Sequence, residues 1–398
     1  MSIRLMVLLG VFAFFGPSVI ASTAEAVVFE PEVEQAEPTQ TARAWLFLAA
    51  KENDTGRINR LIESGIDVNA RDEGGMSALM FAAKHNADKE TLKVLIEAGA
   101  KIDARDVVGN SALIFAAMHT KGVPPFDTLL NAGAGVNVRN EQGQTPLMFA
   151  VQNGAGRDVI DRLFQAKADV NARDIQGRTA LMYGLVAHAE VSVIERLLDE
   201  GADVNAKDAQ YTTPMMFAAR YARSVETIQL LLDEGADVNA KDAQYITPMM
   251  FAARYARSVE TIKLLLDHGA SMYDRIPVDH LPYLYSDLYG DTVPSFAAAY
   301  NPNLEVVRFL IENGGDVNED VFVRRRSRKP GGNVAMKTTL LILAARSNPS
   351  PAVLEFFLDA GVDPKFKTVL NETAIDFAKK NPELKGTDAF WKLNDASF

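Results

Sequence analysis

The stretch AQYTTPMMFAARYARSVETIQLLLDEGADVNAKD at residues 209–242 is one copy of a unit that recurs along most of this chain. Its closing phrase GADVNAKD also stands one unit earlier, at 201–208. The valine of that phrase marks a period of 34 residues, with apolar residues at Val68, Ile102, Val136, Val170, Val204, Val238 and Met272. A period of about 20–50 residues is typical of a solenoid, in which each unit contacts only its neighbours.

Within this unit, the residue types predict two short helices and a finger. Thr213 followed by Pro214 is typical of a helix start, since the hydroxyl accepts a first-turn amide and proline suits the first helical position. A second helix is predicted from about Val225 to Asp233, and Gly235 follows where a left-handed residue ends the helix. The polar segment ADVNAKDAQY then predicts an extended, hairpin-like finger.

These units resemble the ankyrin repeat, whose signature is close to G-x-T-P-L-H-x-A-A…L-L-x-x-G-A-D-V-N-A-x-D. The matching stretches are GQTPLMFAV at 143–151, GRTALMYGL at 177–185, and TPMMFAA at 213–219 and 247–253. A tetratricopeptide repeat also has 34 residues, but its longer helices leave no room for the finger. The resemblance implies an all-α ankyrin-repeat solenoid of helix-turn-helix units with short β-hairpin-like fingers over residues 43–398, in about nine or ten units with atypical caps at both ends.

Two departures from the ankyrin pattern have structural consequences. The usual His of the TPLH motif is replaced by Met at 80, 148, 182, 216 and 250 and by Ile at 114. Apolar packing is therefore expected to replace the hydrogen bonds that this His makes. The Gly that begins the motif is kept in the earlier units but becomes Tyr211 and Tyr245 in two later ones.

Composition and the N-terminal residues restrict the class of protein. The formal net charge of −11 argues against general nucleic-acid binding, and the absence of Cys excludes disulfides. Residues 1–21 resemble a secretory signal peptide, with Arg4, the apolar run LMVLLGVFAFF and the small residues VIA. We expect cleavage after Ala21 or after Ala24; the alternative is an uncleaved membrane anchor, for which the run is short. Residues 22–42 are expected to form a flexible acidic lead-in.

The 34-residue period breaks after Met272. The closing phrase recurs at Val317 and Val362, each 45 residues on, which predicts insertions near 274–290 and 320–337. The first insertion is rich in Tyr and is expected to fold onto the last repeats, with an aromatic lid as the alternative. The second contains the basic run RRRSRKPGG at 324–332, expected to be a solvated loop, with a contact for an acidic partner or lipid headgroup as the alternative.

No sequence motif of catalysis is present. GxSxG, GxxxxGK[ST] and HExxH are all absent, and the five His residues show no ligand spacing. The segment DARDVVGN at 103–110 lacks the Glu that would complete a calcium loop. We therefore expect no enzymatic activity, no cofactor and no metal site.

The candidate binding residues belong to two nearly identical copies, AQYTTPMMFAARYARSVETI at 209–228 and AQYITPMMFAARYARSVETI at 243–262. In ankyrin repeats the fingers and the ends of the first helices line a concave binding face. The resemblance implies partner contacts by Gln210, Tyr211, Arg220, Tyr221, Gln244, Tyr245, Arg254 and Tyr255. Tyr and Arg are enriched at binding hot spots, and this set would suit an acidic or extended peptide. The alternative is a tandem duplication in which Arg stacked on Tyr only covers the surface.

The sequence predicts a non-enzymatic, exported scaffold that binds a protein or peptide partner on its concave face. A periplasmic or secreted location, a monomeric state and the absence of membrane contact after cleavage are further expectations. The periplasmic location rests on a resemblance to exported bacterial ankyrin-repeat proteins. Two alternatives stay open: a small-molecule or glycan binder that uses the Tyr-rich insertion, and a membrane-tethered adaptor.

Overall fold

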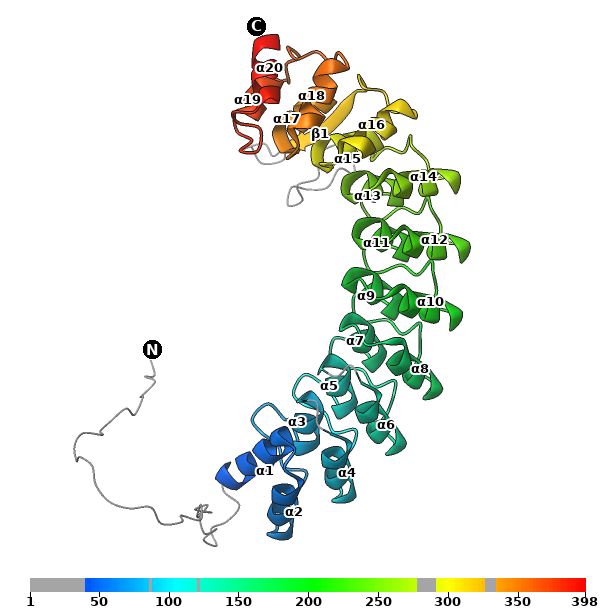
Figure 1. Ribbon diagram of the computed structural model, residues 1–398, viewed down its shortest axis with the longest axis vertical. Helices are drawn as coiled ribbons and strands as arrows, with labels where there is room; N and C mark the ends of the chain where they lie inside the picture. Colours follow the sequence, from blue (N-terminus) through cyan, green and yellow to red (C-terminus); the bar gives the residue numbers. More distant parts are fainter. Residues whose placement is uncertain (1–39, 86–87, 120–121, 278–290, 326–333) are drawn as a thin grey trace, which may run out of the picture. The chain divides into compact units, whose positions relative to one another are not determined.

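The computed structural model describes residues 40–398 apart from 86–87, 120–121, 278–290 and 326–333. Over this range the chain is an ankyrin-repeat solenoid of ten helix pairs, and in Figure 1 the pairs follow one another in chain order. The first helices of the pairs are α1 (Gln40–Glu52), α3 (Ala78–Lys84), α5 (Ala112–His119), α7 (Pro146–Gln152), α9 (Ala180–Ala187), α11 (Pro214–Tyr221), α13 (Pro248–Tyr255), α15 (Val293–Tyr300), α17 (Leu340–Ser347) and α19 (Ala374–Ala378).

The second helices form a parallel row beside the first. Each row packs helix against successive helix, so the repeats have two layers (Figure 1). The second helices are α2 (Thr55–Glu63), α4 (Lys89–Glu97), α6 (Val123–Asn131), α8 (Arg157–Gln165), α10 (Val191–Asp199), α12 (Val225–Asp233), α14 (Val259–Asp267), α16 (Leu304–Glu312), α18 (Pro351–Asp359) and α20 (Asp388–Ala396). The predicted span of α12 is confirmed, and α1 begins three residues before the expected solenoid start at 43.

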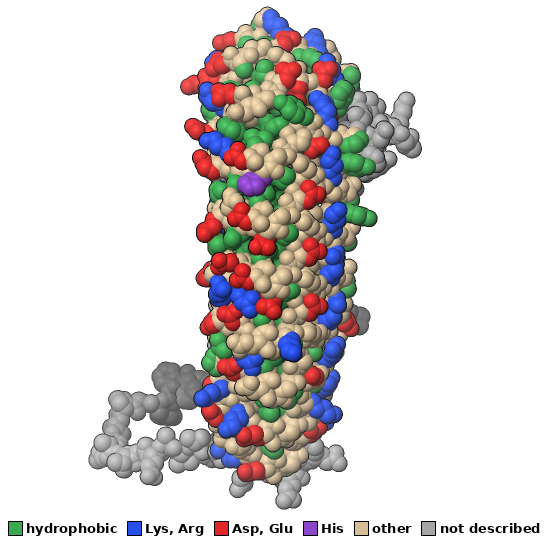
Figure 2. Space-filling view, turned by 90° about the vertical axis from the view of Figure 1, so that its right-hand side faces the viewer, with side chains coloured by type: hydrophobic (Ala, Val, Ile, Leu, Met, Phe, Trp, Pro, Cys, Tyr) green, Lys and Arg blue, Asp and Glu red, His purple; other side chains and the backbone are tan. Residues whose placement is uncertain are grey.

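One continuous hydrophobic core runs between the two rows. Leu and Ile from the second helices meet Ala, Met and Phe from the first, and Leu231 in α12 is fully buried. The face of the second helices is polar instead. Figure 2 shows acidic and basic side chains interspersed over it, with a row of Lys and Arg along one edge. None of the described helices is long and apolar enough to cross a membrane.

The first helices begin as their threonines predict. The Thr213 hydroxyl accepts a hydrogen bond from the Met216 amide at 3.4 Å, and Pro214 takes the first helical position. Apolar packing was expected to replace the hydrogen bonds of the missing His, and these side chains are buried in the core. At two of the six positions, Met sulfur also makes a polar contact, which was not expected. The Sδ atoms of Met216 and Met80 each accept a backbone N–H at 3.4 Å, from Thr213 and Ser77 respectively. A thioether is a weak acceptor, so Met keeps the contact in reduced form.

The fingers are tight turns that hydrogen-bond to one another. In one finger, the Asp208 amide donates to the Thr212 carbonyl at 3.1 Å, and the Gln210 carbonyl accepts the Ala243 amide of the next finger at 2.9 Å. Asn205 adds a side-chain link, since its Nδ2 donates to the Gly235 carbonyl at 2.9 Å. Equivalent asparagines repeat this bond along the stack at Asn69, Asn137, Asn171 and Asn239.

The two expected insertions differ in how much of them the structure describes. Most of the first, including Tyr283, Tyr285 and Tyr289, lies outside the described residues, as do residues 326–332 of the basic run. The second contains an antiparallel hairpin of β1 (Val321–Arg325) and β2 (Val334–Thr338), with Val321 opposite Thr338. The hairpin lies between α16 and α17, in the finger region of that repeat.

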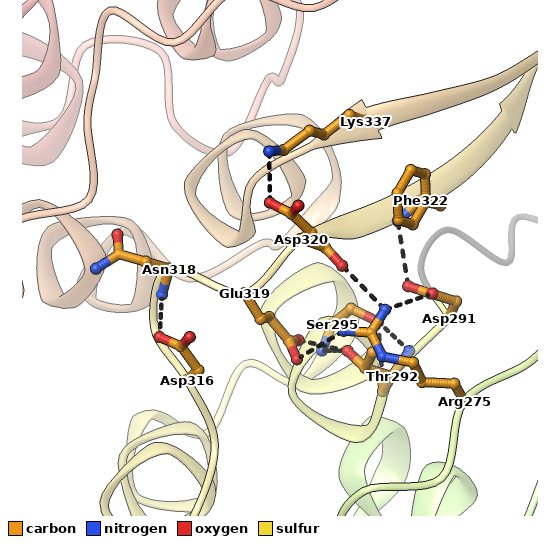
Figure 3. A network of polar contacts seen from close by, with 10 residues as sticks. All are labelled: Arg275, Asp291, Thr292, Ser295, Asp316, Asn318, Glu319, Asp320, Phe322 and Lys337. Carbon is orange, nitrogen blue, oxygen red and sulfur yellow. Dashed lines mark hydrogen bonds and ion pairs between the residues drawn. The ribbon is translucent and has the colours of Figure 1, made fainter.

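A polar network joins the end of the first insertion to the base of the hairpin (Figure 3). Arg275 pairs with buried Asp291 at 3.0 Å, and Asp291 accepts the Phe322 amide at 3.1 Å. Glu319 accepts the Thr292 hydroxyl and lies 3.7 Å from Arg275. Burial raises the pKa of Glu319 to about 7, although both contacts act to lower it. The repeats interrupted by insertions are therefore tied together by charged groups as well as by apolar packing.

Candidate functional site

A groove of about 410 Å³ lies over the fingers and first helices of two consecutive repeats, α11 and α13. It is lined mainly by equivalent residues of the two nearly identical copies, one set from each repeat. Six of the eight candidate residues line it: Gln210, Arg220, Tyr221, Gln244, Arg254 and Tyr255. The structure thus brings together most of the set that the resemblance implied.

Tyr211 and Tyr245 do not line this groove, although they were placed in the same candidate set. Their φ angles are 61° and 63°, so they hold the left-handed turn position that Gly143 and its equivalents occupy in earlier repeats. Tyr211 is 58% exposed at the tip of its finger. A non-glycine residue in this conformation costs about 1–3 kcal/mol of strain. They lie beside the groove on the fingers and are not part of its lining.

Tyrosine rings and guanidinium groups alternate along one side of the groove. The Arg220 Cζ atom lies 4.9 Å from the centre of the Tyr221 ring and 5.3 Å from that of Tyr255. The Arg254 Cζ atom lies 5.0 Å from Tyr255 and 3.9 Å from Tyr300. These five residues, called here the Tyr–Arg ladder, connect three successive first helices through cation–π contacts.

Tyr300, the last member of the Tyr–Arg ladder, was not among the predicted residues. It ends α15, the repeat that follows the first insertion. A signal was present, since FAAAY at 296–300 matches FAARY at 217–221 and 251–255 with only the arginine changed. The 11 extra residues before α15 hid the correspondence because the strict 34-residue count no longer reached it.

The two guanidinium groups of the ladder form no ion pair with any acidic side chain of the described residues. Arg220 is exposed and Arg254 is half-buried, and among the described residues neither forms an ion pair or a side-chain hydrogen bond. A guanidinium that stacks on aromatic rings keeps its N–H groups at the edge of the plane, where they suit a carboxylate. As far as the structure describes the chain, the ladder therefore presents two stacked guanidinium groups without an ion pair to the groove.

The finger end of the same groove is acidic. Asp208 and Asp242 are buried there, and the Asp242 Oδ1 atom accepts the Gln244 and Ile246 amides at 2.8 and 2.9 Å. Burial raises the pKa of Asp242 to about 6, the two amide hydrogen bonds oppose that rise, and the charge of Asp208 adds to it. In each repeat the first helix lies between this acidic end and the arginine. The helical rise per residue gives a separation of about 10 Å along the helix.

The raised pKa of Asp242 predicts a pH dependence of stability. The folded chain holds this proton more tightly than the unfolded chain, so the group's stabilising effect is largest below pH about 4 and is lost as the pH rises through about 6. Asp242→Asn should remove that slope yet keep the fold, because Asn140 fills the equivalent position and accepts the Gln142 and Gln144 amides at 3.0 and 2.9 Å. Urea denaturation at pH 4 and pH 7.5 measures the slope. Equal slopes in the variant and the natural chain would contradict the assignment.

A second hollow of about 470 Å³ continues from the groove past the end of α13. It shares Arg254 and Tyr255 with the groove and adds Tyr300 and Pro302. The ladder therefore borders two adjoining depressions along the same face.

Within the described ranges, no group of three or more His, Asp or Glu side chains could hold a metal ion. The predicted absence of metal, cofactor and catalysis stays a prediction. Stacked rings and guanidinium groups beside an open groove can bind a ligand through non-covalent contacts, without a metal or cofactor.

A family comparison identifies the architecture. The family model "Ankyrin repeats (3 copies)" matches residues 46–124, 121–208, 185–276 and 215–321. The chain belongs to the ankyrin-repeat family. Ankyrin repeats are generally scaffolds for protein–protein interaction. A search of curated proteins finds no match.

One of two similar solved structures agrees with this fold at a TM-score of 0.50. The crystal structure of the human ASB11 ankyrin repeat domain is 26% identical with a TM-score of 0.50, and the match covers 57% of this chain and 98% of that one. The ankyrin repeat domain of Bcl-3, a member of the IkappaB protein family, is 25% identical with a TM-score of 0.48, over 56% of this chain and 97% of that one. The expected resemblance to ankyrin-repeat proteins is thus confirmed, while a likeness to exported ones stays an expectation.

Proposed function

We propose that this protein is a non-enzymatic scaffold that holds a segment of a protein partner in the groove over α11 and α13. The observation that carries the proposal is the Tyr–Arg ladder, in which Arg220 and Arg254 are stacked on tyrosine rings yet lack any ion-pair partner among the described residues. Stacked Tyr and Arg in a depression are the residue types that contribute most to binding energy. The −11 net charge of the chain makes this cationic edge locally distinct.

A purely structural role for the ladder is the competing interpretation. Arginines in the last turn of a helix interact favourably with its dipole, and stacking on Tyr shields apolar surface. Two features favour binding. The ladder runs beside depressions on the surface, and the residues that line the groove include buried polar groups, among them an Arg178 Nε atom without a hydrogen-bond partner in the described part of the chain.

The proposal is tested with the double substitution Tyr221→Ala and Tyr255→Ala. Each truncation should weaken a groove-bound partner by more than about 1 kcal/mol, roughly five-fold, as hot-spot residues do. Melting temperature should change little, since both rings are only half-buried surface groups. Affinity capture followed by quantitation of the same partner in both samples gives the binding readout.

Tyr273→Ala supplies the matched control, because Tyr273 is 77% exposed and lies outside the groove lining. It should leave capture unchanged. If the double variant is destabilised and still captures the partner as well as the natural chain does, the ladder is structural and the proposed function is wrong.

Export completes the proposal. The apolar run of residues 5–15 and the residues VIA and STA that end at Ala21 and Ala24 support a cleaved signal peptide and a periplasmic or secreted location. The net charge of −11 argues against nucleic-acid contact, and a monomer without membrane contact after cleavage is part of the proposal. The mass of the chain purified from the exported fraction decides the cleavage point; a cytoplasmic chain that still begins at Met1 contradicts export. The Tyr-rich insertion as a glycan or small-molecule site, and the membrane-tethered adaptor, remain the alternatives.

A further inference from the structure

The spacing of the ladder restricts the shape of what it can hold. Arg220 and Arg254 lie 5.3 and 5.0 Å from the same Tyr255 ring centre, so their Cζ atoms are no more than about 10 Å apart. That distance is also the spacing of one repeat, since packed helices lie about 8–10 Å apart. Because the two arginines are equivalent residues of successive repeats, a ligand that pairs with both should present two anionic groups on one side at about this repeat spacing of 8–10 Å.

Among regular peptide conformations, polyproline II fits this spacing in the smallest volume. It has about 3 residues per turn and rises about 3.1 Å per residue, which places residues i and i+3 on one side about 9 Å apart. An extended β-strand puts same-side residues about 6.6 or 13 Å apart, because its side chains alternate. An α-helix matches only at i and i+7, and its diameter of about 10–12 Å is wide for a groove of about 410 Å³.

The groove lining supports the same period. Gln210 and Gln244 line its finger side one repeat apart, as the arginines line the helix side. Their amides can donate to ligand backbone carbonyls, which polyproline II leaves free of internal hydrogen bonds. Grooves lined by aromatic side chains are the usual receptors for such segments. The buried Asp208 and Asp242 at the finger end disfavour a carboxylate there, so the acidic side of the ligand faces the ladder.

We infer that the groove binds an extended acidic segment in polyproline II conformation, in which two carboxylates three residues apart pair with Arg220 and Arg254. This inference rests on the proposed function and adds the chemistry and the spacing of the ligand. In this arrangement each repeat contacts three residues of the ligand. Its arginine pairs with one ligand carboxylate, and its glutamine donates to one ligand backbone carbonyl. Thr212 and Ile246, the single difference between the two copies, both line the groove and make its two halves unequal, so the segment binds in one direction.

Short acetylated proline-rich peptides test the inference by fluorescence anisotropy with the full chain. The probes carry two Glu residues at spacings i+2, i+3 or i+4 in otherwise identical proline sequences, and a neutral control carries Gln-Pro-Pro-Gln. The Glu-Pro-Pro-Glu peptide should bind at least about ten-fold tighter than the others, because only it forms both charge-assisted hydrogen bonds. Equal affinities for all three acidic spacings, or tighter binding of a helical peptide with its carboxylates seven residues apart, would overturn it.

Charge-neutral variants assign the contacts. Arg220→Gln and Arg254→Gln should each remove most of the advantage of the i+3 spacing and leave binding of the neutral peptide unchanged. Arg223→Gln is the matched control, since Arg223 is exposed and lies outside the groove lining. The assignment would be contradicted if the Arg223 variant alone lost the preference for the i+3 spacing, or if both ladder variants kept that preference. Thermal melting confirms that each variant is folded.

The outcomes separate this inference from the proposed function. If capture of a partner depends on Tyr221 and Tyr255 but the peptides show no spacing preference, the groove binds proteins and the polyproline II ligand is wrong. If capture is insensitive to those tyrosines, the proposed function itself is wrong whatever the peptides show.

Discussion

Replacing Leu231 by Ala is expected to lower the free energy of unfolding by about 2–5 kcal/mol, the range found for truncating a buried leucine. Leu231 is fully buried in α12, at the interface between its own first helix α11 and the neighbouring second helices α10 and α14. The removed atoms leave a cavity that the flanking repeats can close only in part. Because a solenoid is held by nearest-neighbour interfaces, weakening one unit weakens its contacts on both sides.

Urea denaturation of the purified chain measures this loss. Leu265→Ala provides a replicate, since Leu265 holds the equivalent buried position one repeat later, and Leu230→Ala provides the control on a half-buried neighbour. We expect Leu265→Ala to match Leu231→Ala and Leu230→Ala to cost less than half as much. A loss below about 0.5 kcal/mol for Leu231→Ala, the size of an ordinary surface substitution, would show that the buried face of α12 is assigned wrongly.

Much of the fold follows from local sequence patterns. The spacing of Ile228, Leu231 and Leu232 predicts which face of α12 is buried, and Thr213 with Pro214 predicts where α11 begins; the structure confirms both. These predictions succeed because helix periodicity and capping depend on residues within one repeat. Repetition in register then extends them to the neighbouring units.

Sequence patterns did not indicate three features of the structure, of which one is a contact between repeats. Met216 sulfur accepts a backbone amide, a role that a hydrophobic residue type does not suggest. Tyr300 joins the ladder across an insertion, and Tyr211 keeps a left-handed turn that normally needs Gly. The first depends on the side-chain conformation at a helix start, the second on the neighbouring repeat and the third on a strained backbone, none of which composition and spacing encode.

The sequence could predict which residues belong to the candidate site but not how their side chains are arranged. The two copies indicated Arg220, Tyr221, Arg254 and Tyr255, and the structure places these four together. The order in which rings and guanidinium groups alternate, and the absence of ion pairs for the two arginines in the described part of the chain, emerge only in three dimensions. That arrangement carries the proposed function, which the residue types alone left balanced against surface coverage.

Three buried asparagines follow the ladder into the last repeats, and the sequence patterns did not indicate them. Asn301, Asn348 and Asn381 each end or follow a first helix and donate Nδ2 to two carbonyl groups of the preceding repeat. Asn348 bonds the Ala298 and Asn301 carbonyls at 3.0 and 2.9 Å, while its Oδ1 accepts the Ser350 amide at 2.9 Å. The bonds of Asn301 and Asn348 cross the two junctions where insertions interrupt the regular fingers, and those of Asn381 cross the next junction. All three asparagines therefore join repeats at the opposite end of the first helices.

Asn348→Ala is expected to lower the free energy of unfolding by about 2–5 kcal/mol. The substitution leaves two buried carbonyl groups and the amide of half-buried Ser350 without their partner. Each unsatisfied buried group costs about 1–3 kcal/mol, reduced by any hydrogen bond that water can supply. Within the described residues, α17–α20 contact the rest of the stack through the α15–α17 and α16–α18 interfaces at this junction. They should therefore lose hydrogen-exchange protection before α1–α14 do.

Asn313→Ala is the control. It removes an asparagine whose hydrogen bond is exposed, so the comparison shows how much of the loss comes from the buried bonds of Asn348. Asn313 also donates to a carbonyl, that of Phe309 at 2.8 Å, but it is exposed, so water replaces the lost contact and the cost should stay below about 1 kcal/mol. Asn348→Asp gives the opposite comparison. It keeps the acceptor for Ser350 but places a carboxylate oxygen against two carbonyl oxygens, so it should destabilise at least as strongly as Ala at neutral pH. If Asn348→Ala costs no more than Asn313→Ala, or if protection is lost evenly along the stack, the asparagines do not hold these junctions and the interrupted repeats depend on their apolar core alone.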